Sequence, residues 1–416
     1  MADQMLRPSE VAVLTGCADK PYALGLASTL QSQGVMLDLI GGDDLDVPEF
    51  RNGSGVRFLN LRGNQRSDVG AAAKAARVLA YYGRLLCYAA TARPKMFHIL
   101  WNNKFEAVDR TLVMLYYKAL RKKIALTVHN VNAGARDGND GILNRVTLRT
   151  QYRLADHIFV HTTKMKSELV DQFGVHASAV SVIPFGVNQT VPNTALTPAE
   201  ARQRLGIAPG ERTMLFFGSI APYKGLEYLI QALPRLANPE SYRLIIVGRP
   251  KAGSGTYWDD VHAAINADRS GVKILKRIEF VPDADTELYF KAADVLILPY
   301  KFIFQSGVLF LAYNFGLPVL VADVGSLKDD VVEGRTGSVV KPEDPADLAR
   351  GIDAYFSSGL FKDLPRRRQD ISKYAAEHYS WDKVGDISRA VYAALLGRQP
   401  LVIDRSQLPT GDLADR

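Results

Sequence analysis

Short, unbroken apolar runs, each followed by a helix-like pattern, are the feature that most restricts how this chain can fold. Examples are VAVL at residues 11–14, LIIV at 244–247 and VLIL at 295–298. A strand that is apolar on both faces must be covered on both faces, as happens in parallel sheets flanked by helices. The chain is therefore predicted to be an α/β protein with doubly wound sheets.

The alternation of strands and helices occurs twice. It stops near residue 184, and a stretch rich in Pro, Thr and Asn at 188–213 is predicted to be a linker with one short helix. With 416 residues the chain is long enough for two cores. We predict an N-terminal Rossmann-like domain at 1–190, a C-terminal one at 191–380, a closing helix at 381–397 that packs back towards the first domain, and a tail at 398–416.

The second domain is expected to hold six strands, and ligands of such open sheets bind at the carboxyl ends of the strands. Two domains of this kind are expected to face each other across a ligand-binding cleft. The expected strands are Met214–Gly218, Arg243–Gly248, Glu279–Val281, Val295–Pro299, Pro318–Ala322 and Gly337–Val340.

Several classes of protein are disfavoured by what the sequence lacks. Two cysteines, Cys17 and Cys87, form no disulfide framework. The N-terminal stretch has no apolar leader segment, so we expect a protein in the cytoplasm, either free or bound at the inner face of the membrane. There is no P-loop, no GxGxxG, no HExxH and no CxxC motif, so neither a cofactor nor a metal ion is expected.

Positive charge is concentrated in the first half of the chain. Residues 51–123 hold 15 Lys and Arg against three Asp and Glu. A basic face attracts nucleic acid, anionic lipid or an acidic ligand. The stretch lacks the interleaved aromatic residues and modules of nucleic-acid binders, so nucleic acid is not expected as a partner.

One lysine stands in the turn of FFGSIAPYKGLEYL, residues 216–229. Gly218 ends an apolar strand, Ser219 follows it, and Lys224 comes directly before Gly225 and a helical pattern. A lysine at a helix N-terminus suits a phosphate or diphosphate. The commoner alternative is a solvated surface lysine.

A second helix start follows the strand DVLILPY. Gln305, Ser306 and Gly307 precede an apolar helix that continues with Val308. Because glycine has no Cβ, an anion could approach this backbone closely. The alternative is that Ser306 is an ordinary N-cap.

The third candidate is His129, in LTVHNVNAGARDGND at 126–140. It follows an apolar strand and precedes a polar loop, so it can face a ligand. The alternative is a histidine that satisfies local backbone groups. Asp137 and Asp140, in the same loop, are candidate bases should the reaction proceed with inversion, although loop carboxylates are usually solvated. Gly16 ends the first strand in a glycine turn.

Taken together, these segments resemble the GT-B-fold glycosyltransferases, specifically the large retaining family four. The resemblance covers nearly the whole chain and rests on FFGSIAPYKGLEYLIQAL, LIIVGRP, ADVLILPY, GLPVLVADVGSLKDDVVEGRTGSVV and SWDKV in the family's order, with LADHIFVHTTKMKSEL and VIPFGV closing the first domain. It implies that Lys224 binds the diphosphate of a nucleotide sugar and that His129 contacts the transferred sugar. Further donor contacts are implied for Gly16, Ser219, Val281, Gln305, Ser306, Gly307 and Val308.

The sequence departs from the family at three positions. Ser219 stands where an arginine is usual, and Ile303 and Leu311 stand where two glutamates are usual. The function implied is transfer of a hexose-type sugar from a nucleotide sugar to a hydroxyl of a glycan acceptor, without a metal and with retention, in polysaccharide or glycoconjugate synthesis. The alternatives are a non-catalytic sugar-nucleotide-binding partner and a GT-B sugar-nucleotide epimerase.

Two basic and apolar stretches, at 74–95 and 110–123, suggest where the acceptor is met. Such stretches can rest on an anionic membrane, and Arg121, Lys122 and Lys123 are the predicted contacts for membrane and acceptor. The resemblance favours a lipid-linked or oligosaccharide acceptor. The alternative is that the apolar stripes pack on their own sheet and the basic residues coat the outer face.

Overall fold

The chain forms two compact units in the computed structural model, which describes residues 9–51, 55–65, 70–188 and 190–398. The first unit comprises residues up to Gly186 together with those from Ser380 onward, and the second runs from Val187 to Tyr379. The boundary thus lies four residues before the expected position at 190. Apart from Arg398, the expected tail lies outside the described residues.

The first unit is built on a seven-stranded parallel sheet with the order β3-β2-β1-β4-β5-β6-β7. Strands β1, β2, β4 and β6 are buried along their whole length, and β5 along all but its first residue, as apolar runs predict. The strands are β1 (Val11–Leu14), β2 (Leu37–Gly41), β3 (Val56–Asn60), β4 (Met96–Ile99), β5 (Lys123–Thr127), β6 (His157–Val160) and β7 (Val180–Val182).

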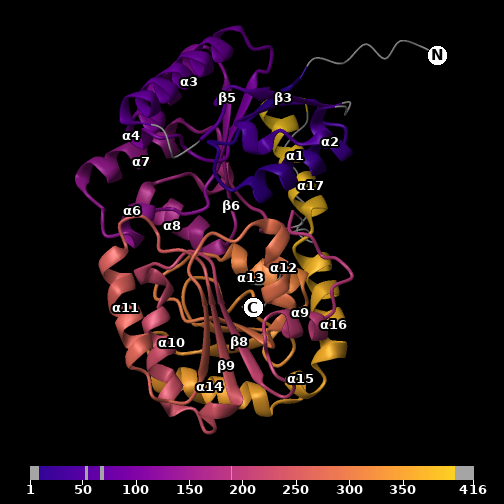
Figure 1. Ribbon diagram of the computed structural model, residues 1–416. Coiled ribbons are helices and arrows are strands. Elements are labelled where there is room, and N and C mark those ends of the chain that lie inside the picture. The colour runs from indigo at the N-terminus through magenta and orange to yellow at the C-terminus, as the bar shows by residue number, and fades with distance from the viewer. Residues whose placement is uncertain (1–8, 52–54, 66–69, 189, 399–416) are drawn as a thin grey trace, which may run out of the picture. The chain divides into compact units, whose positions relative to one another are not determined.

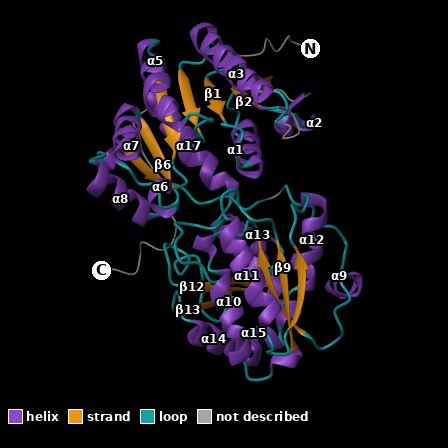
Figure 2. Ribbon diagram, turned by 60° about the vertical axis from the view of Figure 1, so that its left-hand side comes forward, coloured by secondary structure: helices purple, strands orange, loops and turns teal. Residues whose placement is uncertain are grey.

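Helices cover both faces of this sheet because the chain winds outward from β1 in both directions. Figure 1 shows α3, α4 and α7 on one side of the sheet and α1, α2 and α17 on the other, and Figure 2 shows α5 and α7 together on the first side. The helices are α1 (Lys20–Ser32), α2 (Pro48–Arg51), α3 (Ala71–Thr91), α4 (Glu106–Val108), the π-helical turn η2 (Asp109–Val113), α5 (Met114–Ala119), α6 (Ala133–Arg136), α7 (Ile142–Leu154), α8 (Thr163–Phe173) and α17 (Trp381–Leu395).

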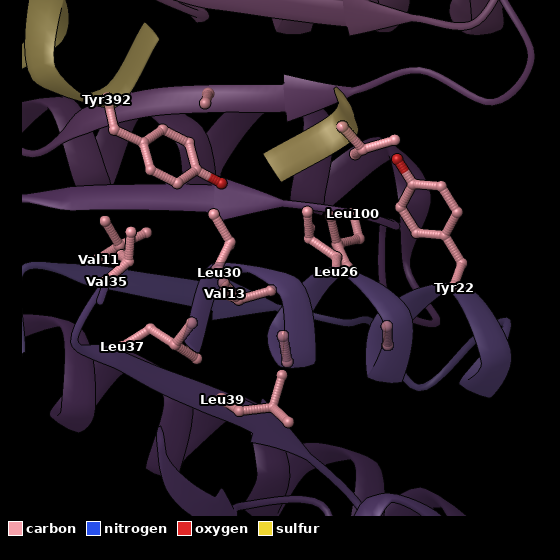
Figure 3. Close-up of a cluster of buried hydrophobic side chains, with 14 of the residues drawn as sticks. Val11, Val13, Tyr22, Leu26, Leu30, Val35, Leu37, Leu39, Leu100 and Tyr392 are labelled. Carbon is pink, nitrogen blue, oxygen red and sulfur yellow. The ribbon is translucent and has the colours of Figure 1, made fainter. Parts of the chain in front are cut away.

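The last helix, α17, belongs to the core of the first unit. It packs against α1, and Trp381, Val384 and Tyr392 join Leu26 and Leu30 of α1 in one buried cluster (Figure 3). Trp381 lies so close to two backbone turns that a Cβ on Gly25 or Gly186 would come within 2.2 Å of its indole ring. The helix is therefore a structural part of the first unit.

The second unit contains a six-stranded parallel sheet with the order β10-β9-β8-β11-β12-β13. Its strands are β8 (Arg212–Phe217), β9 (Tyr242–Val247), β10 (Lys273–Arg277), β11 (Val295–Leu298), β12 (Val319–Ala322) and β13 (Gly337–Val340). Its helices are α9 (Pro198–Arg204), α10 (Leu226–Ala232), α11 (Gly255–Ala267), α12 (Asp283–Ala292), α13 (Gly307–Asn314), α14 (Pro345–Ser357), α15 (Gly359–Lys362) and α16 (Leu364–His378).

One expected strand is wrong. Residues 279–281 form a loop, and the strand of this region is β10, which begins six residues earlier. Because β10 lies at the edge of the sheet, its sequence KILKR needs only two apolar residues and exposes Lys273, Lys276 and Arg277. The apolar-run criterion therefore misses it, and Val281 falls in the loop between β10 and α12.

Candidate functional site

Lys224 lies in a short 3-10 turn, Pro222–Lys224, between β8 and α10. Its side chain turns back towards the end of β8, and only 6% of the residue is exposed. Gly218, with a φ of +102°, is placed so that a Cβ there would lie 2.8 Å from Lys224 Nζ. The glycine at the end of the strand therefore gives the ammonium group its place.

The ammonium group of Lys224 has no acidic partner among the described residues. Nζ lies 3.4 Å from the carbonyl oxygen of Phe217 and 5.3 Å from the ring centre of Tyr300. Burial lowers the pKa of Lys224 below its ordinary value. A buried cation is costly unless it is paired, so this geometry favours the binding of an anion beside Gly218.

The first turn of α13 lies beside Gly218 and Lys224. A Cβ on Gly218 would be 3.5 Å from Val308 Cγ2, so Val308 and Lys224 flank the same glycine. Ser306 occupies the N-cap position of α13, yet its side chain makes no capping hydrogen bond. The free backbone N–H groups at the start of α13 therefore add to the positive potential near Lys224.

The other predicted donor contacts of the second unit are placed as follows. Ser219 is exposed directly after Gly218, Gly307 is exposed at the start of α13, and Gln305 is partly buried just before it. Val281 is partly buried in the loop after β10. The sequence order of β8, its turn and α13 explains how most of these residues come together, whereas Val281 lies in a separate loop, between β10 and α12.

Asp330 is a buried acid that the sequence did not single out. Its Oδ2 lies 3.4 Å from Gln305 Nε2, and the Tyr379 hydroxyl donates to its Oδ1 over 3.3 Å. Burial raises the pKa of Asp330 to about 7. The carboxyl group therefore holds the side chain of Gln305, just before α13, from the buried side.

We expect Asp330→Asn to flatten the pH dependence of stability. Because the pKa of Asp330 is raised in the folded protein, its contribution to stability is fully present below the ordinary value near 4 and is lost as pH rises through about 7. Thermal unfolding between pH 4 and 8 should show the melting temperature of wild type falling more steeply than that of the variant. Parallel curves would contradict this account, and Asp260→Asn, at an exposed position of α11 in the same unit, serves as the control.

His129 lies two residues beyond β5, in an aromatic cluster of the first unit. Its ring stacks on Trp101 with 4.0 Å between ring centres and an angle of 3° between the planes. The edge of Tyr22 meets it at 4.6 Å. Gly16 lies against this cluster, since a Cβ on it would come within 2.6 Å of the carbonyl oxygen of Trp101, and its φ is +58°. The structure thus brings Gly16 and His129 together through Trp101.

Hydrogen bonds assign the proton on the His129 ring. His161 Nδ1 lies 3.4 Å from the carbonyl oxygen of Ile183, which can only accept, so Nδ1 carries the proton of His161. His161 Nε2 then accepts from His129 Nδ1 over 3.0 Å. His129 Nε2, which is itself buried, is left as an acceptor without a hydrogen-bond partner among the described residues.

Both imidazoles are neutral near pH 7. Burial lowers the pKa of His129 well below its ordinary value, and it lowers the pKa of His161 to about 4. A neutral ring with a bare Nε2 accepts a hydrogen bond, for example from a hydroxyl group.

The two loop carboxylates are engaged elsewhere. Asp140 pairs with Arg145 at 2.7 Å, and this arginine holds the pKa of Asp140 well below its usual range. Asp137 pairs with Arg136 at 2.9 Å. Carboxylates held in ion pairs are weak bases, so the arrangement disfavours either one as a general base.

The predicted membrane contacts are only partly available. Lys122 Nζ donates to the carbonyl oxygens of Ala92 and Pro94, each over 2.8 Å, so it satisfies backbone groups just beyond the end of α3. Lys123 pairs with Asp156 at 3.4 Å. Arg121 is exposed, with a φ of +57°. A triple substitution at these positions would therefore disturb the fold as well as the surface charge.

The two residues at the family's glutamate positions are apolar and at least partly buried. Leu311 is 6% exposed and belongs to the buried face of α13, while Ile303 is partly buried. Within the described residues, no cluster of three or more His, Cys, Asp and Glu is placed to hold a metal ion. No helix in the described part of the chain is both long and apolar enough to cross a bilayer.

Sequence profiles match both units. The profile described as "Glycosyltransferase Family 4" matches residues 21–191, and that described as "Glycosyl transferases group 1" matches residues 211–358. Both units therefore match models of glycosyltransferases, and the chain is a GT-B protein similar to glycosyltransferase family four. The family four resemblance read from the motifs, and the α/β fold class with two doubly wound domains of the GT-B type, are thereby confirmed.

Curated relatives include the D-inositol 3-phosphate glycosyltransferase of Geodermatophilus obscurus, 30% identical over 254 residues, which are 58% of this chain and 53% of the relative. The chain thus spans about half the length of these relatives. An uncharacterized glycosyltransferase of Methanocaldococcus jannaschii is 24% identical over 387 residues, which are 89% of this chain and 93% of the relative.

Solved structures share this fold. Sucrose-phosphate synthase from Thermosynechococcus elongatus aligns with a TM-score of 0.73 and 16% identity over 94% of this chain and all of that chain. HepE from Anabaena, solved in complex with UDP-glucose, aligns with a TM-score of 0.68 and 16% identity over the same shares.

Proposed function

We propose that the protein is a glycosyltransferase that moves a hexose-type sugar from a nucleotide sugar to a hydroxyl group of a glycan acceptor. The observation that carries the proposal is the buried ammonium group of Lys224, without an acidic partner in the described chain, beside the first turn of α13. These groups suit the diphosphate of a nucleotide sugar. The similarity to the family and the UDP-glucose bound by HepE support this choice of ligand.

In the proposed reaction, negative charge develops on the leaving diphosphate as its bond to the sugar breaks. Lys224 and the amides at the start of α13 stabilise that charge where it appears. His129 Nε2 accepts a hydrogen bond from a sugar hydroxyl and so orients the ring. Since Asp137 and Asp140 are engaged in ion pairs, we propose a retaining route, in which the acceptor proton passes to the departing phosphate.

We further propose that the reaction needs no metal ion, because Lys224 supplies the positive charge that a divalent cation supplies elsewhere. The acceptor is proposed to be a lipid-linked glycan, met at the membrane surface during polysaccharide or glycoconjugate synthesis. The concentration of basic residues in the first half of the chain supports an anionic acceptor or surface.

Thermal shift with UDP-, GDP- and ADP-sugars, beginning with UDP-glucose, tests the donor. Release of nucleoside diphosphate with and without a lipid extract then tests transfer, in buffer with and without EDTA. Stabilisation by a nucleotide sugar together with acceptor-dependent release supports the proposal. Binding without release under any condition would favour the non-catalytic partner, an alternative to which the buried Leu311 also points.

A further inference from the structure

Exposed apolar side chains are gathered on one layer of helices in the first unit. Of the ten large apolar side chains that are exposed in the described chain, eight lie on or beside α3, α4, η2, α5 and α7. Figure 1 shows α3, α4 and α7 along the same side of the sheet. We define the apolar surface by the six of them on neighbouring helices: Val108, Leu112, Leu115, Ile142, Leu143 and Val146.

These side chains form stripes that face away from the sheet. Val108, Leu112 and Leu115 follow one another at helical spacing, while their neighbours Val113 and Met114 are buried. Leu112 is 65% exposed and Ile142 is 84% exposed. The apolar core of the unit is therefore already supplied by other residues of the same helices, and the surface itself is left in contact with solvent.

The two stripes lie on helices that are joined to each other. Arg110, buried in η2, donates from Nη1 to Asn144 Oδ1 of α7 over 2.9 Å. On the other side, the Tyr116 hydroxyl of α5 donates to the carbonyl oxygen of Leu86 in α3 over 3.1 Å. The apolar surface is thus one continuous feature carried on a fixed scaffold.

The charges around the apolar surface are mostly positive. The sequences of α3 and α7 contain no acidic residue and six basic ones. Two acids on neighbouring segments are paired, the exposed Glu106 with Arg110 and the partly buried Asp140 with Arg145. The basic residues are Lys74, Arg77, Arg84, Arg145, Arg149 and Arg153.

We propose that the apolar surface inserts into the boundary between headgroups and acyl chains of an anionic bilayer, with the arginines of α7 at the phosphates. An apolar stripe flanked mainly by basic residues is the pattern of helices that lie in a membrane interface. This inference rests on the proposed function, because it assigns the place where the enzyme meets a lipid-linked acceptor. The predicted membrane contact thereby shifts from Lys122 and Lys123, which make contacts within the unit, to η2, α5 and α7.

Co-sedimentation with vesicles tests the inference. Wild type should bind vesicles of phosphatidylcholine and phosphatidylglycerol better than vesicles of phosphatidylcholine alone, and part of the binding should survive high salt because apolar burial is not screened. The double variant L112S/I142S should bind at least about tenfold more weakly, since two exposed apolar side chains no longer enter the bilayer. Its melting temperature should match that of wild type.

Phe280→Ser removes an exposed apolar side chain from the second unit and is the matched control, expected to bind vesicles like wild type. Vesicle binding by L112S/I142S equal to that of wild type, or wild-type binding abolished by salt, would overturn the inference. So would light scattering that shows a wild-type dimer which the double variant breaks, because the surface would then join two copies.

A second set of measurements separates this inference from the proposed function. Thermal shift with UDP, GDP and ADP is recorded on wild type and on L112S/I142S. Wild type that binds a nucleotide but no vesicle refutes only the membrane surface. Wild type that binds vesicles but no nucleotide refutes only the proposed donor site. A Leu115→Trp variant quenched by brominated phosphatidylcholine would directly report insertion of this surface.

Discussion

Replacing Lys224 with methionine should reduce sugar transfer by about 10²- to 10³-fold, because the group that stabilises the leaving diphosphate is lost. Affinity for the nucleoside diphosphate should fall by roughly 1.5–3 kcal/mol, the usual value of a charge-assisted hydrogen bond. The folded protein should at the same time keep or gain stability, because methionine fills the site without a buried charge. Kinetics, nucleotide titration and thermal unfolding of the same variant measure these three effects.

This prediction is specific because transfer and nucleotide affinity should fall while the stability of the folded protein is kept or rises. A lysine with only a structural role would lower the melting temperature when replaced and leave nucleotide affinity unchanged. Lys251→Met, a substitution in the loop after β9, is the control for a general loss of positive charge in this unit. A Lys224→Met protein that is folded and transfers sugar at the wild-type rate would refute the donor site proposed here.

His129→Ala should reduce transfer by at least about tenfold while changing affinity for the free nucleoside diphosphate by less than about twofold, since the lost hydrogen bond is to the sugar. The assigned tautomer adds a second expectation. His161→Phe keeps an aromatic ring but removes the acceptor for His129 Nδ1. Either ring nitrogen of His129 can then carry the proton. Transfer by this variant should be impaired, again without loss of nucleotide affinity.

The pH dependence of transfer provides the check. Because burial holds the pKa of His129 well below its ordinary value, the ring should add no step to the rate profile near pH 6.5, where a free imidazole titrates. Equal losses of transfer and of nucleotide affinity in His129→Ala would indicate a structural histidine. Wild-type transfer by His161→Phe would contradict the tautomer assignment.

The two sheets could be predicted from the sequence because central strands of a parallel sheet are buried on both faces and leave unbroken apolar runs. The edge strand β10 could not, since one side of it meets solvent and lysines are tolerated there. The same limit applies to Lys122, which resembles a surface cation in sequence and satisfies backbone carbonyls in the structure.

The positions of the candidate site residues could be predicted from the sequence, but their burial, protonation and pKa could not. The turn after β8 places Lys224 near a helix start in any doubly wound sheet, but its burial depends on Gly218, Tyr300 and Val308 from other segments. The proton on His129 is fixed by His161, 32 positions along the chain. Asp330 acquires its raised pKa mainly from tertiary burial, for which a local sequence carries no signal.

The way in which α17 completes the first unit sets the order of assembly during synthesis. Residues 187–379 form a unit from one continuous stretch, which can fold as soon as it leaves the ribosome. The unit that is begun first waits for Trp381, Val384 and Tyr392, including the bond over 2.6 Å between the Tyr392 hydroxyl and His98 Nδ1. The N-terminal sheet is therefore made first and completed last, and until α17 emerges the apolar face that this helix covers stays exposed.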